Sequence, residues 1–341
     1  MRLLIWGAGA IGGTIGAYFI KAGHDVTFVD LAADHVAAIN EKGLRIEGPI
    51  DNFTVEARAF TPADLTGQWE TLLLCTKGHH TESAMGLLEP HLSDNGYVVS
   101  VQNGLNEALI ARLIGEERTV GSFVNFGADY LQPGVIHYGG RGAVVLGELN
   151  GHMTERLNDL HSLFLSFDDR AITTQNIWGY LWGKMAYGAL LYATALTDAS
   201  IADALAAESY RDVFIALGKE VLVVAAAKSV KPEGFNGFNP LAFMPEASPA
   251  MSQASLREMV AFNQKSAKTH SGIYRDLAVR KRKTEADAHL GMMIALAKEA
   301  DLDMPLTEKI LELIHEIEEG KRSLSWENLE LVKTIHEAGK V

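Results

Sequence analysis

Residues 3–12 read Leu3-Leu4-Ile5-Trp6-Gly7-Ala8-Gly9-Ala10-Ile11-Gly12, an apolar run that leads directly into closely spaced glycines. This pattern predicts a buried strand, a tight turn and the start of a helix. The helical stretch that follows ends at Gly23, and residues 26–29 form a second apolar run that ends at Asp30. A strand, a glycine-rich turn, a helix and a strand in this order are typical of a dinucleotide-binding βαβ unit.

The glycines of this turn have separate roles. Gly7 allows the tight turn, Gly9 lets the backbone approach a pyrophosphate, and Gly12 lets the helix pack closely on the strand. The amides and the positive dipole end of the helix attract phosphates. The alternative is a strand–helix turn that is merely rich in glycine. We expect the whole turn to bind the cofactor through Gly7, Ala8, Gly9, Ala10, Ile11 and Gly12.

Asp30 lies 18 residues after Gly12. A carboxylate at this place can accept hydrogen bonds from the ribose hydroxyls of adenosine and would repel a 2′-phosphate. Asp30 therefore favours NAD over NADP. The alternative is that Asp30 begins a loop and points to solvent.

The chain has 341 residues, about twice the length of a typical domain, so we expect two domains. Further short apolar runs at residues 72–75, 97–101 and 119–126 alternate with helical segments and predict a mainly parallel sheet. Residues 134–138 and 143–147 predict a hairpin that completes the first domain. We therefore expect an α/β protein with a Rossmann-type dinucleotide-binding domain over residues 1–170.

Beyond residue 170 helical periodicity replaces the strand pattern, which predicts an all-helical domain over residues 171–341. We expect this domain to bind the substrate and to support dimer contacts. The stretch from residue 177 is apolar enough to raise a membrane span, but it contains Lys184 and has ordinary helices beside it, so we expect a buried helix. Residues 231–249, with four prolines, predict a loop. The expected helices are 174–196, 201–227, 249–268, 284–300 and 306–319.

The composition excludes several classes of protein. Lys and Arg number 30 against 43 Asp and Glu, and this net charge of −13 argues against nucleic acid or an anionic membrane as a partner. The single cysteine, Cys75, cannot form an intramolecular disulfide or a cysteine-rich zinc site. His79 and His80 are adjacent and lack the spacing of metal ligands, so we expect no metal. We expect a cytoplasmic protein that acts on a small carboxylate.

Three positions carry candidate chemistry. Lys77 and the run Gln102-Asn103-Gly104 each follow a predicted strand, where open α/β sheets bind ligands, unless they are solvated loop residues. Lys184 lies in the middle of an apolar helix. A desolvated lysine can act as a general acid or base, whereas a lysine that extends to solvent has no such role.

A further cluster of candidate residues extends from His270 to Asp287. Ser271 can donate to a substrate carboxylate, and Arg275 or Lys77 can meet its charge. Thr284 and Asp287 have the spacing of a capping box, which would place Glu285 in a first helical turn, where it can bind ribose hydroxyls. The basic run at residues 280–283 is either a solvated face or an anion site.

Taken together, these residues resemble the ketopantoate reductase (2-dehydropantoate 2-reductase) family over nearly the whole chain. The resemblance implies a Rossmann domain joined to a helical domain of the 6-phosphogluconate-dehydrogenase type, NADPH as cofactor, and a place in pantothenate biosynthesis. It also implies Lys184 as the general acid, Asn103 and Lys77 lining cofactor and substrate, Glu285 holding the cofactor or the lysine, and Ala128 near the nicotinamide half. The residues that carry it are Gly7 to Gly13, Lys77, Gln102-Asn103-Gly104, Gly134-Val135-Ile136-His137, Lys184, Thr284-Glu285, Asp287 and Pro305.

The sequence departs from this pattern at four positions. The family usually has asparagines where this chain has Gly188 and Tyr192, a second serine at Gly272, and a basic residue at Asp30. We therefore expect hydride transfer between NAD(P)H and the keto group of ketopantoate or a related 2-keto acid. The alternatives are an NAD-dependent dehydrogenase of a different hydroxy acid or of an opine-like imine, and a non-catalytic NAD(P)-binding redox sensor.

Overall fold

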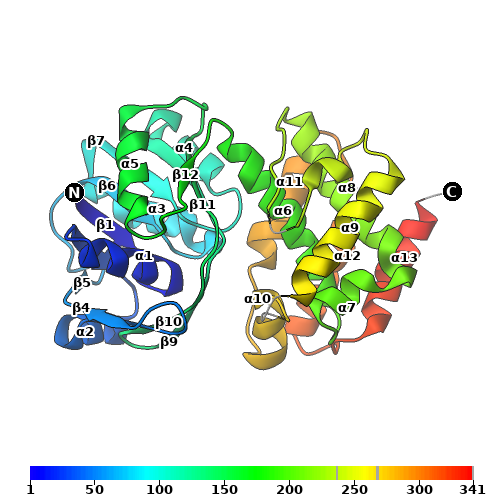
Figure 1. Ribbon diagram of the computed structural model, residues 1–341, viewed down its shortest axis with the longest axis horizontal. Helices are drawn as coiled ribbons and strands as arrows, with labels where there is room; N and C mark the ends of the chain where they lie inside the picture. Colours follow the sequence, from blue (N-terminus) through cyan, green and yellow to red (C-terminus); the bar gives the residue numbers. More distant parts are fainter. Residues whose placement is uncertain (236, 266–268, 340–341) are drawn as a thin grey trace. The chain divides into compact units, whose positions relative to one another are not determined.

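The structure is a computed structural model that describes residues 1–235, 237–265 and 269–339. The chain divides into two compact units, Met1–Ile177 and Trp178–Val341 (Figure 1). The first unit is built of strands and helices with a mainly parallel sheet, and the second is helical. The predicted fold class is therefore confirmed.

The first unit holds two sheets and the helices that pack on them. In chain order its elements are β1 (Arg2–Trp6), α1 (Ala10–Lys21), β2 (Asp25–Val29), α2 (Ala33–Lys42), β3 (Leu44–Glu47), β4 (Phe53–Val55), β5 (Arg58–Phe60), β6 (Trp69–Leu74), α3 (Thr81–Leu88), β7 (Leu92–Ser100), α4 (Glu107–Ile114), β8 (Thr119–Val124), β9 (Gly127–Gln132), β10 (Val135–Gly140), β11 (Val144–Glu148), α5 (Glu155–Leu165) and β12 (Ile172–Thr173).

The main sheet has eight strands in the order β12-β11-β8-β7-β6-β1-β2-β5. All neighbouring strands are parallel except β8 and β11. Strand β1 lies between β2 and β6, so the chain leaves β1 toward one side of the sheet and later returns to build the other side. This change of direction is the switch point at which open α/β sheets bind ligands, at the carboxyl ends of the strands.

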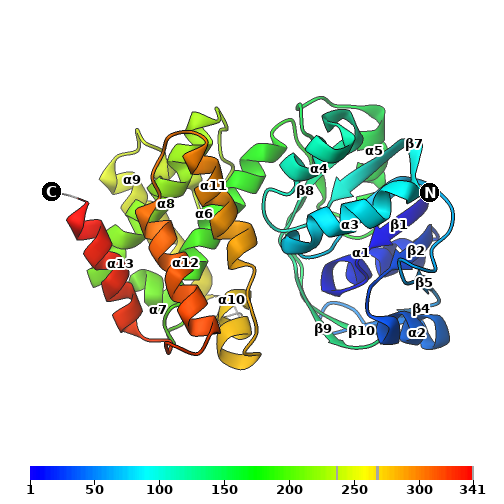
Figure 2. The same cartoon turned by 180° about the vertical axis from the view of Figure 1, so that it is seen from behind.

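Both faces of the main sheet are covered, which explains the continuous apolar run of β1. Leu3 and Ile5 pack into a core with residues of α1, α5 and the smaller sheet. Leu4 and Trp6 belong to the core on the other face, with residues of α3 and α4. Figure 1 shows α1 and α5 on one face of the sheet, and Figure 2 shows α3 and α4 on the other. A parallel strand buried on both faces has no polar side, so its sequence does not alternate.

The predicted hairpin of residues 134–138 and 143–147 is wrong. Strand β10 pairs antiparallel with β9 and parallel with β3 in a four-stranded sheet of order β4-β3-β10-β9, whereas β11 pairs with β8 and β12 in the main sheet. The intervening glycines carry the chain from one sheet to the other. A Cβ atom at Gly142 would lie 1.9 Å from the carbonyl oxygen of Asn125, so this crossing requires glycine.

A buried ion pair fixes this crossing to the end of α5. The carboxylate of Asp168, whose side chain is 1% exposed, accepts hydrogen bonds from Arg141 Nη2 at 2.6 Å and Nε at 3.1 Å, and from the amide of Arg170 at 3.0 Å. Burial opposes ionisation of Asp168, but these hydrogen bonds outweigh it and lower the pKa of the carboxyl group. The charged form of Asp168 is therefore the one that stabilises the fold.

We expect Asp168→Asn to lower the free energy of unfolding by about 3 kcal/mol at pH 7, because Arg141 then loses a buried counter-ion. Since the pKa is lowered on folding, this stabilisation is present above the ordinary Asp pKa and is lost as the pH falls through the lowered value. Urea unfolding at pH 7 and at several values below about pH 5 measures this effect. The difference in the free energy of unfolding between wild type and variant should become smaller as the pH falls. The control is Asp169→Asn, because Asp169 also pairs with Arg141 but its side chain is 77% exposed. Equal losses in the two variants would contradict the prediction.

The second unit consists of helices joined by loops. Its elements are α6 (Ile177–Thr194), α7 (Ile201–Ala206), α8 (Arg211–Ala227), α9 (Pro249–Gln264), α10 (Gly272–Tyr274), α11 (Met292–Lys298), α12 (Pro305–Glu318) and α13 (Trp326–Ala338), with π-helical turns at Arg275–Val279 and Asp287–Gly291.

The structure corrects two of the expected helices and adds one. The predicted helix 201–227 is interrupted after Ala206, where Tyr210 stacks on Trp326 and donates its hydroxyl hydrogen to Glu330. The predicted helix 284–300 opens with a π-helical turn. Helix α13 was not predicted, and residues 266–268 of the predicted helix 249–268 lie outside the described residues. Within the described ranges, no helix combines the length and the hydropathy needed to span a bilayer.

Candidate functional site

The glycine-rich turn leaves β1 at the switch point, and two of its glycines are required by packing. Gly7 has φ +101°, and a Cβ there would lie 2.9 Å from the carbonyl carbon of Cys75. A Cβ at Gly12 would lie 2.1 Å from the carbonyl oxygen of Gly7. Gly9 differs, because a Cβ there would meet no atom within 4 Å. The chain therefore keeps open space beside Gly9, at the start of α1.

The amides beside this open space can bind an anion. Helix α1 has no side-chain cap and no acidic residue in its first turn. Among the described residues nothing accepts a hydrogen bond from the amide of Gly9. Unpaired amides and the positive end of the helix dipole favour phosphate oxygens. The space at Gly9 and these amides fit the pyrophosphate of a dinucleotide.

Asp30 follows β2 and is anchored to the same turn. Its Oδ2 accepts the amide of Ala8 at 2.8 Å, and its Oδ1 accepts the amide of Ala32 at 3.0 Å. Asp30 therefore does not extend freely into solvent. Each carboxylate oxygen keeps a second lone pair that can accept a ribose hydroxyl.

Lys77 and Asn103 follow β6 and β7, the next two strands of the sheet. Both side chains are partly buried. Gln102 is 3% exposed and donates to the carbonyl oxygen of Thr76 at 2.9 Å and to Thr81 Oγ1 at 3.0 Å, so it ties the two strand ends together. Gln102 is therefore a structural residue rather than a solvated loop residue. Lys77 and Asn103 share the carboxyl edge of the sheet with the glycine-rich turn.

Ala128 lies in β9 of the smaller sheet, opposite Tyr138 of β10. It is partly buried and packs against the core of the first unit. Its role near the nicotinamide stays a prediction.

Lys184 is the one charged residue in the sequence of α6. The helix is mostly buried, and Lys184 belongs to its partly exposed face, together with Tyr180, Tyr187, Gly188 and Leu191. A Cβ at Gly188, one turn after Lys184, would meet no atom within 4 Å in the part of the chain that the structure describes. Open space therefore lies on α6 beside the candidate general acid.

Tyr192 continues this row by another turn but is 1% exposed. Its hydroxyl lies 3.2 Å from Nδ1 of His289. Burial, and then the nearby carboxylates of Glu285 and Glu318, raise the pKa of Tyr192 well above its ordinary value. Tyr192 therefore stays protonated and is held by its own unit.

Ser271 is 2% exposed and caps α10, because its Oγ accepts the amide of Tyr274 at 3.1 Å. Its hydroxyl hydrogen can still be donated to another acceptor. Gly272 follows, and among the described residues a Cβ there would meet no atom within 4 Å. Ser271 therefore lies beside an open position, as Lys184 does.

Glu285 lies at the start of a helical segment, as its place after Thr284 predicts, because its carbonyl oxygen accepts the amide of His289 at 3.0 Å. Thr284 Oγ1 accepts the amide of Ala286 at 3.1 Å, and the amide and hydroxyl of Thr284 both donate to Glu318 at 2.7 Å. Ala286 separates Glu285 from the π-helical turn that begins at Asp287. In a capping box the side chain of Asp287 would accept the amide of Thr284. The carboxylate of Glu318, from a distant part of the chain, accepts this amide instead.

The basic run at residues 280–283 is partly neutralised within the protein. Asp276 Oδ1 accepts Arg280 Nη1 at 3.0 Å and Arg282 Nε at 2.9 Å. In the part of the chain that the structure describes, no three His, Cys, Asp or Glu residues form a group that could hold a metal ion.

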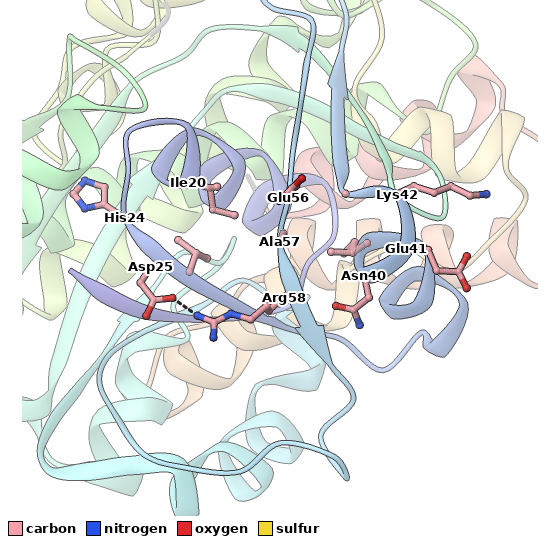
Figure 3. A pocket seen from close by; sticks show the side chains of 12 residues that line it. Ile20, His24, Asp25, Asn40, Glu41, Lys42, Glu56, Ala57 and Arg58 are labelled. Carbon is pink, nitrogen blue, oxygen red and sulfur yellow. Dashed lines mark hydrogen bonds and ion pairs between the residues drawn. The ribbon is translucent and has the colours of Figure 1, made fainter.

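A separate pocket of about 610 Å³ lies at the amino ends of β2 and β5, away from the glycine-rich turn (Figure 3). Asp25 and Arg58 pair with each other along its wall, and Asn40 is occupied by the backbone of Ala59. Since these polar groups satisfy one another, we assign no ligand to this pocket.

Sequence analysis missed one residue that contacts the glycine-rich turn. His35 of α2 lies with Nε2 2.9 Å from the carbonyl oxygen of Ala8. The two residues are 27 positions apart, and no motif joins them. Only the fold brings them together.

A doubly wound parallel sheet with a glycine-rich turn at its switch point defines the class of Rossmann-type α/β proteins. The model of the family "Ketopantoate reductase PanE/ApbA" matches residues 3–151, and that of its C-terminal domain matches residues 176–318. The chain therefore belongs to the ketopantoate reductase family.

Similar proteins carry related names. The 2-dehydropantoate 2-reductase of Pyrococcus horikoshii is 32% identical over 54% of this chain, and the match spans 60% of that relative's length. An uncharacterised oxidoreductase of Bacillus subtilis, YkpB, is 25% identical over 91% of this chain and 96% of its own.

Two solved structures share the fold. A PanE/ApbA family ketopantoate reductase from Ralstonia eutropha has a TM-score of 0.79 and 24% identity, over 95% of this chain and all of its own. A D-mandelate dehydrogenase bound to NADH and anilino(oxo)acetate has a TM-score of 0.80 and 20% identity, over 94% of this chain and 99% of its own.

Proposed function

We propose that the protein is an NAD(P)H-dependent oxidoreductase that reduces the keto group of a 2-keto acid, in the manner of a 2-dehydropantoate 2-reductase. The observation that carries this proposal is the open space at Gly9, at the switch point of the sheet, with a Gly9 amide for which no described residue provides an acceptor. The names of the relatives support the substrate class, since 2-dehydropantoate is a 2-keto acid and mandelate is a 2-hydroxy acid.

In this proposal the residues of the chain bind the acid and move one proton. A bound reduced nicotinamide supplies the hydride for the carbonyl carbon. Lys184 donates a proton from Nζ to the keto oxygen as negative charge develops there, and in the reverse direction neutral Lys184 accepts it. Ser271 donates its hydroxyl hydrogen to the substrate carboxylate. Lys77 or Arg275 supplies a cation for that carboxylate.

The remaining predicted residues bind and orient. We propose that Asn103 orients both cofactor and substrate from the end of β7, and that Ala128 lies against the nicotinamide half. Glu285 holds a ribose hydroxyl or the ammonium group of Lys184. These roles follow from the resemblance and from the place of each residue in its own unit.

We propose that NADH is the preferred cofactor, because the Asp30 carboxylate is fixed beside the turn by the amides of Ala8 and Ala32. A 2′-phosphate near this charge is disfavoured. The D-mandelate dehydrogenase neighbour was solved with NADH.

Asp30→Asn is expected to raise the ratio of kcat/KM for NADPH to that for NADH by about tenfold, since it removes the charge but keeps an oxygen that accepts the amide of Ala8. Steady-state kinetics with both cofactors measure this ratio. The control is Asp34→Asn, because Asp34 is exposed and accepts the amide of His35 rather than an amide of the turn. An unchanged ratio in Asp30→Asn would show that Asp30 does not select the cofactor.

One observation favours a second candidate, a dehydrogenase of a hydroxy acid other than pantoate. Gly188 offers no side chain to hold a substrate hydroxyl, and the hydroxyl of Tyr192 contacts His289. A substrate without a further hydroxyl group would not need the asparagine side chains that the family usually has in place of Gly188 and Tyr192.

The test is a tryptophan fluorescence titration with NADH and NADPH, followed by turnover of ketopantoate and other 2-keto acids with the tighter cofactor, each with and without an amine. Turnover of a 2-keto acid without amine supports the proposal. Turnover only with amine would indicate an opine-like reaction. Tight cofactor binding without any turnover would indicate a redox sensor and would overturn the proposed activity.

A further inference from the structure

The imidazole of His35 is buried, with 1% of the residue exposed, and both of its nitrogens are engaged. Nδ1 lies 2.9 Å from the amide nitrogen of Gly134, and Nε2 lies 2.9 Å from the carbonyl oxygen of Ala8. A backbone amide can only donate, so Nδ1 accepts. Nε2 therefore carries the proton and donates it to Ala8. The neighbours of the ring assign this tautomer.

This contact fixes the direction of the peptide that enters the open space. The carbonyl of Ala8 and the amide of Gly9 belong to one trans peptide, so they point in opposite directions. While His35 holds the carbonyl, the Gly9 amide hydrogen points away from His35. If the peptide rotated by half a turn, the carbonyl oxygen would take the place of that amide hydrogen. A carbonyl oxygen in that place would repel a phosphate instead of binding it.

The ring itself is held by the smaller sheet. It packs edge-on against Tyr130 of β9, with ring centroids 5.1 Å apart and an interplanar angle of 77°. Gly134 lies in the turn between β9 and β10. The preceding peptide is held separately, because Asp30 accepts the amide of Ala8 at 2.8 Å. Two different elements therefore fix the two peptides that flank Ala8.

We propose that His35 is a positioning residue of the dinucleotide turn: it aims the Gly9 amide at the pyrophosphate and so sets cofactor affinity without touching the cofactor. This inference rests on the proposed dinucleotide binding. It also gives the smaller sheet a role in cofactor affinity, since Gly134 and Tyr130 hold the ring that holds the turn.

Two variants separate the two contacts of the ring. His35→Gln places an amide Nε2 near the original Nε2, so it can still donate to Ala8. His35→Asn places Oδ1 near the original Nδ1, so it can still accept from Gly134 but no longer reaches Ala8. We expect His35→Asn to raise the Kd and KM for NADH about tenfold, with kcat at saturating NADH within about twofold of wild type, and His35→Gln to retain most of the affinity.

The comparison is made by fluorescence titration, steady-state kinetics and thermal unfolding of both variants. Wild-type affinity in His35→Asn, or the same loss in both variants, would overturn the inference while leaving the proposed function intact. Failure of the wild-type protein to bind either NADH or NADPH would instead overturn the proposed function.

A second measurement needs no variant. Long-range 15N–1H NMR of the wild-type imidazoles reports which nitrogen carries the proton. The proposal expects a proton on Nε2 of His35, both without and with NADH. A proton on Nδ1 would overturn the inference even if both variants fail to fold.

Discussion

Lys184→Ala is expected to lower kcat for 2-keto acid reduction by about 100-fold or more while the protein stays folded, because the alkoxide that forms on hydride transfer loses its proton donor. Lys184 is on the partly exposed face of α6, so truncation leaves the buried face of the helix intact. Stopped-flow measurement of NADH oxidation and the far-UV circular dichroism spectrum test the two parts of this statement.

Lys184→Arg separates charge from proton transfer. A guanidinium keeps the positive charge but does not give up its proton near neutral pH, so we expect substrate binding to survive and kcat to fall nearly as far. Tyr180→Phe, one turn earlier on the same face, is the control and should leave kcat within about twofold. A near-normal kcat in Lys184→Ala would remove Lys184 from the mechanism.

Gly9→Val is expected to raise the Kd for NADH and NADPH by about 100-fold with little change in melting temperature. The φ of Gly9 is −69°, which other residues adopt readily, and a Cβ there would have no atom of the described residues within 4 Å. The new side chain would occupy the space that we assign to the pyrophosphate. Isothermal titration calorimetry and thermal unfolding measure the two quantities.

Gly12→Ala, in contrast, is expected to destabilise the protein, because the new Cβ would lie 2.1 Å from the carbonyl oxygen of Gly7. This clash should lower the free energy of unfolding by about 3 kcal/mol. If Gly9→Val binds either cofactor as tightly as wild type does, the turn is a structural feature without a ligand.

The order of the elements around the glycine-rich turn could be predicted from local sequence. The run from Leu3 to Trp6, the turn and the run ending at Asp30 each have a pattern that depends on neighbours in the chain. Strand, helix and turn preferences are local, so β1, α1 and β2 appear where the sequence predicts them. Lys77 and Asn103 could likewise be placed at strand ends, because each follows an apolar run.

Pairing between distant segments could not be predicted in this way. The apolar run of residues 143–147 predicts a strand, but only the packing of the sheets shows that β11 pairs with β8 rather than with β10. The capping of Thr284 by Glu318 has the same origin. Such contacts bring together residues that are far apart in the chain, and no local pattern reports them.

The sequence by itself determined the class of the first domain, the turn that is suited to phosphates and Lys184 as a charge in an apolar helix. The tertiary structure alone decided that Gly9 is open while Gly7 and Gly12 are packed, that Asp30 is anchored to the turn, and that His35 holds the carbonyl of Ala8. The reason is physical, because a residue's type and spacing are local properties, whereas the space and the hydrogen-bond partners around it are supplied by segments that only folding brings together.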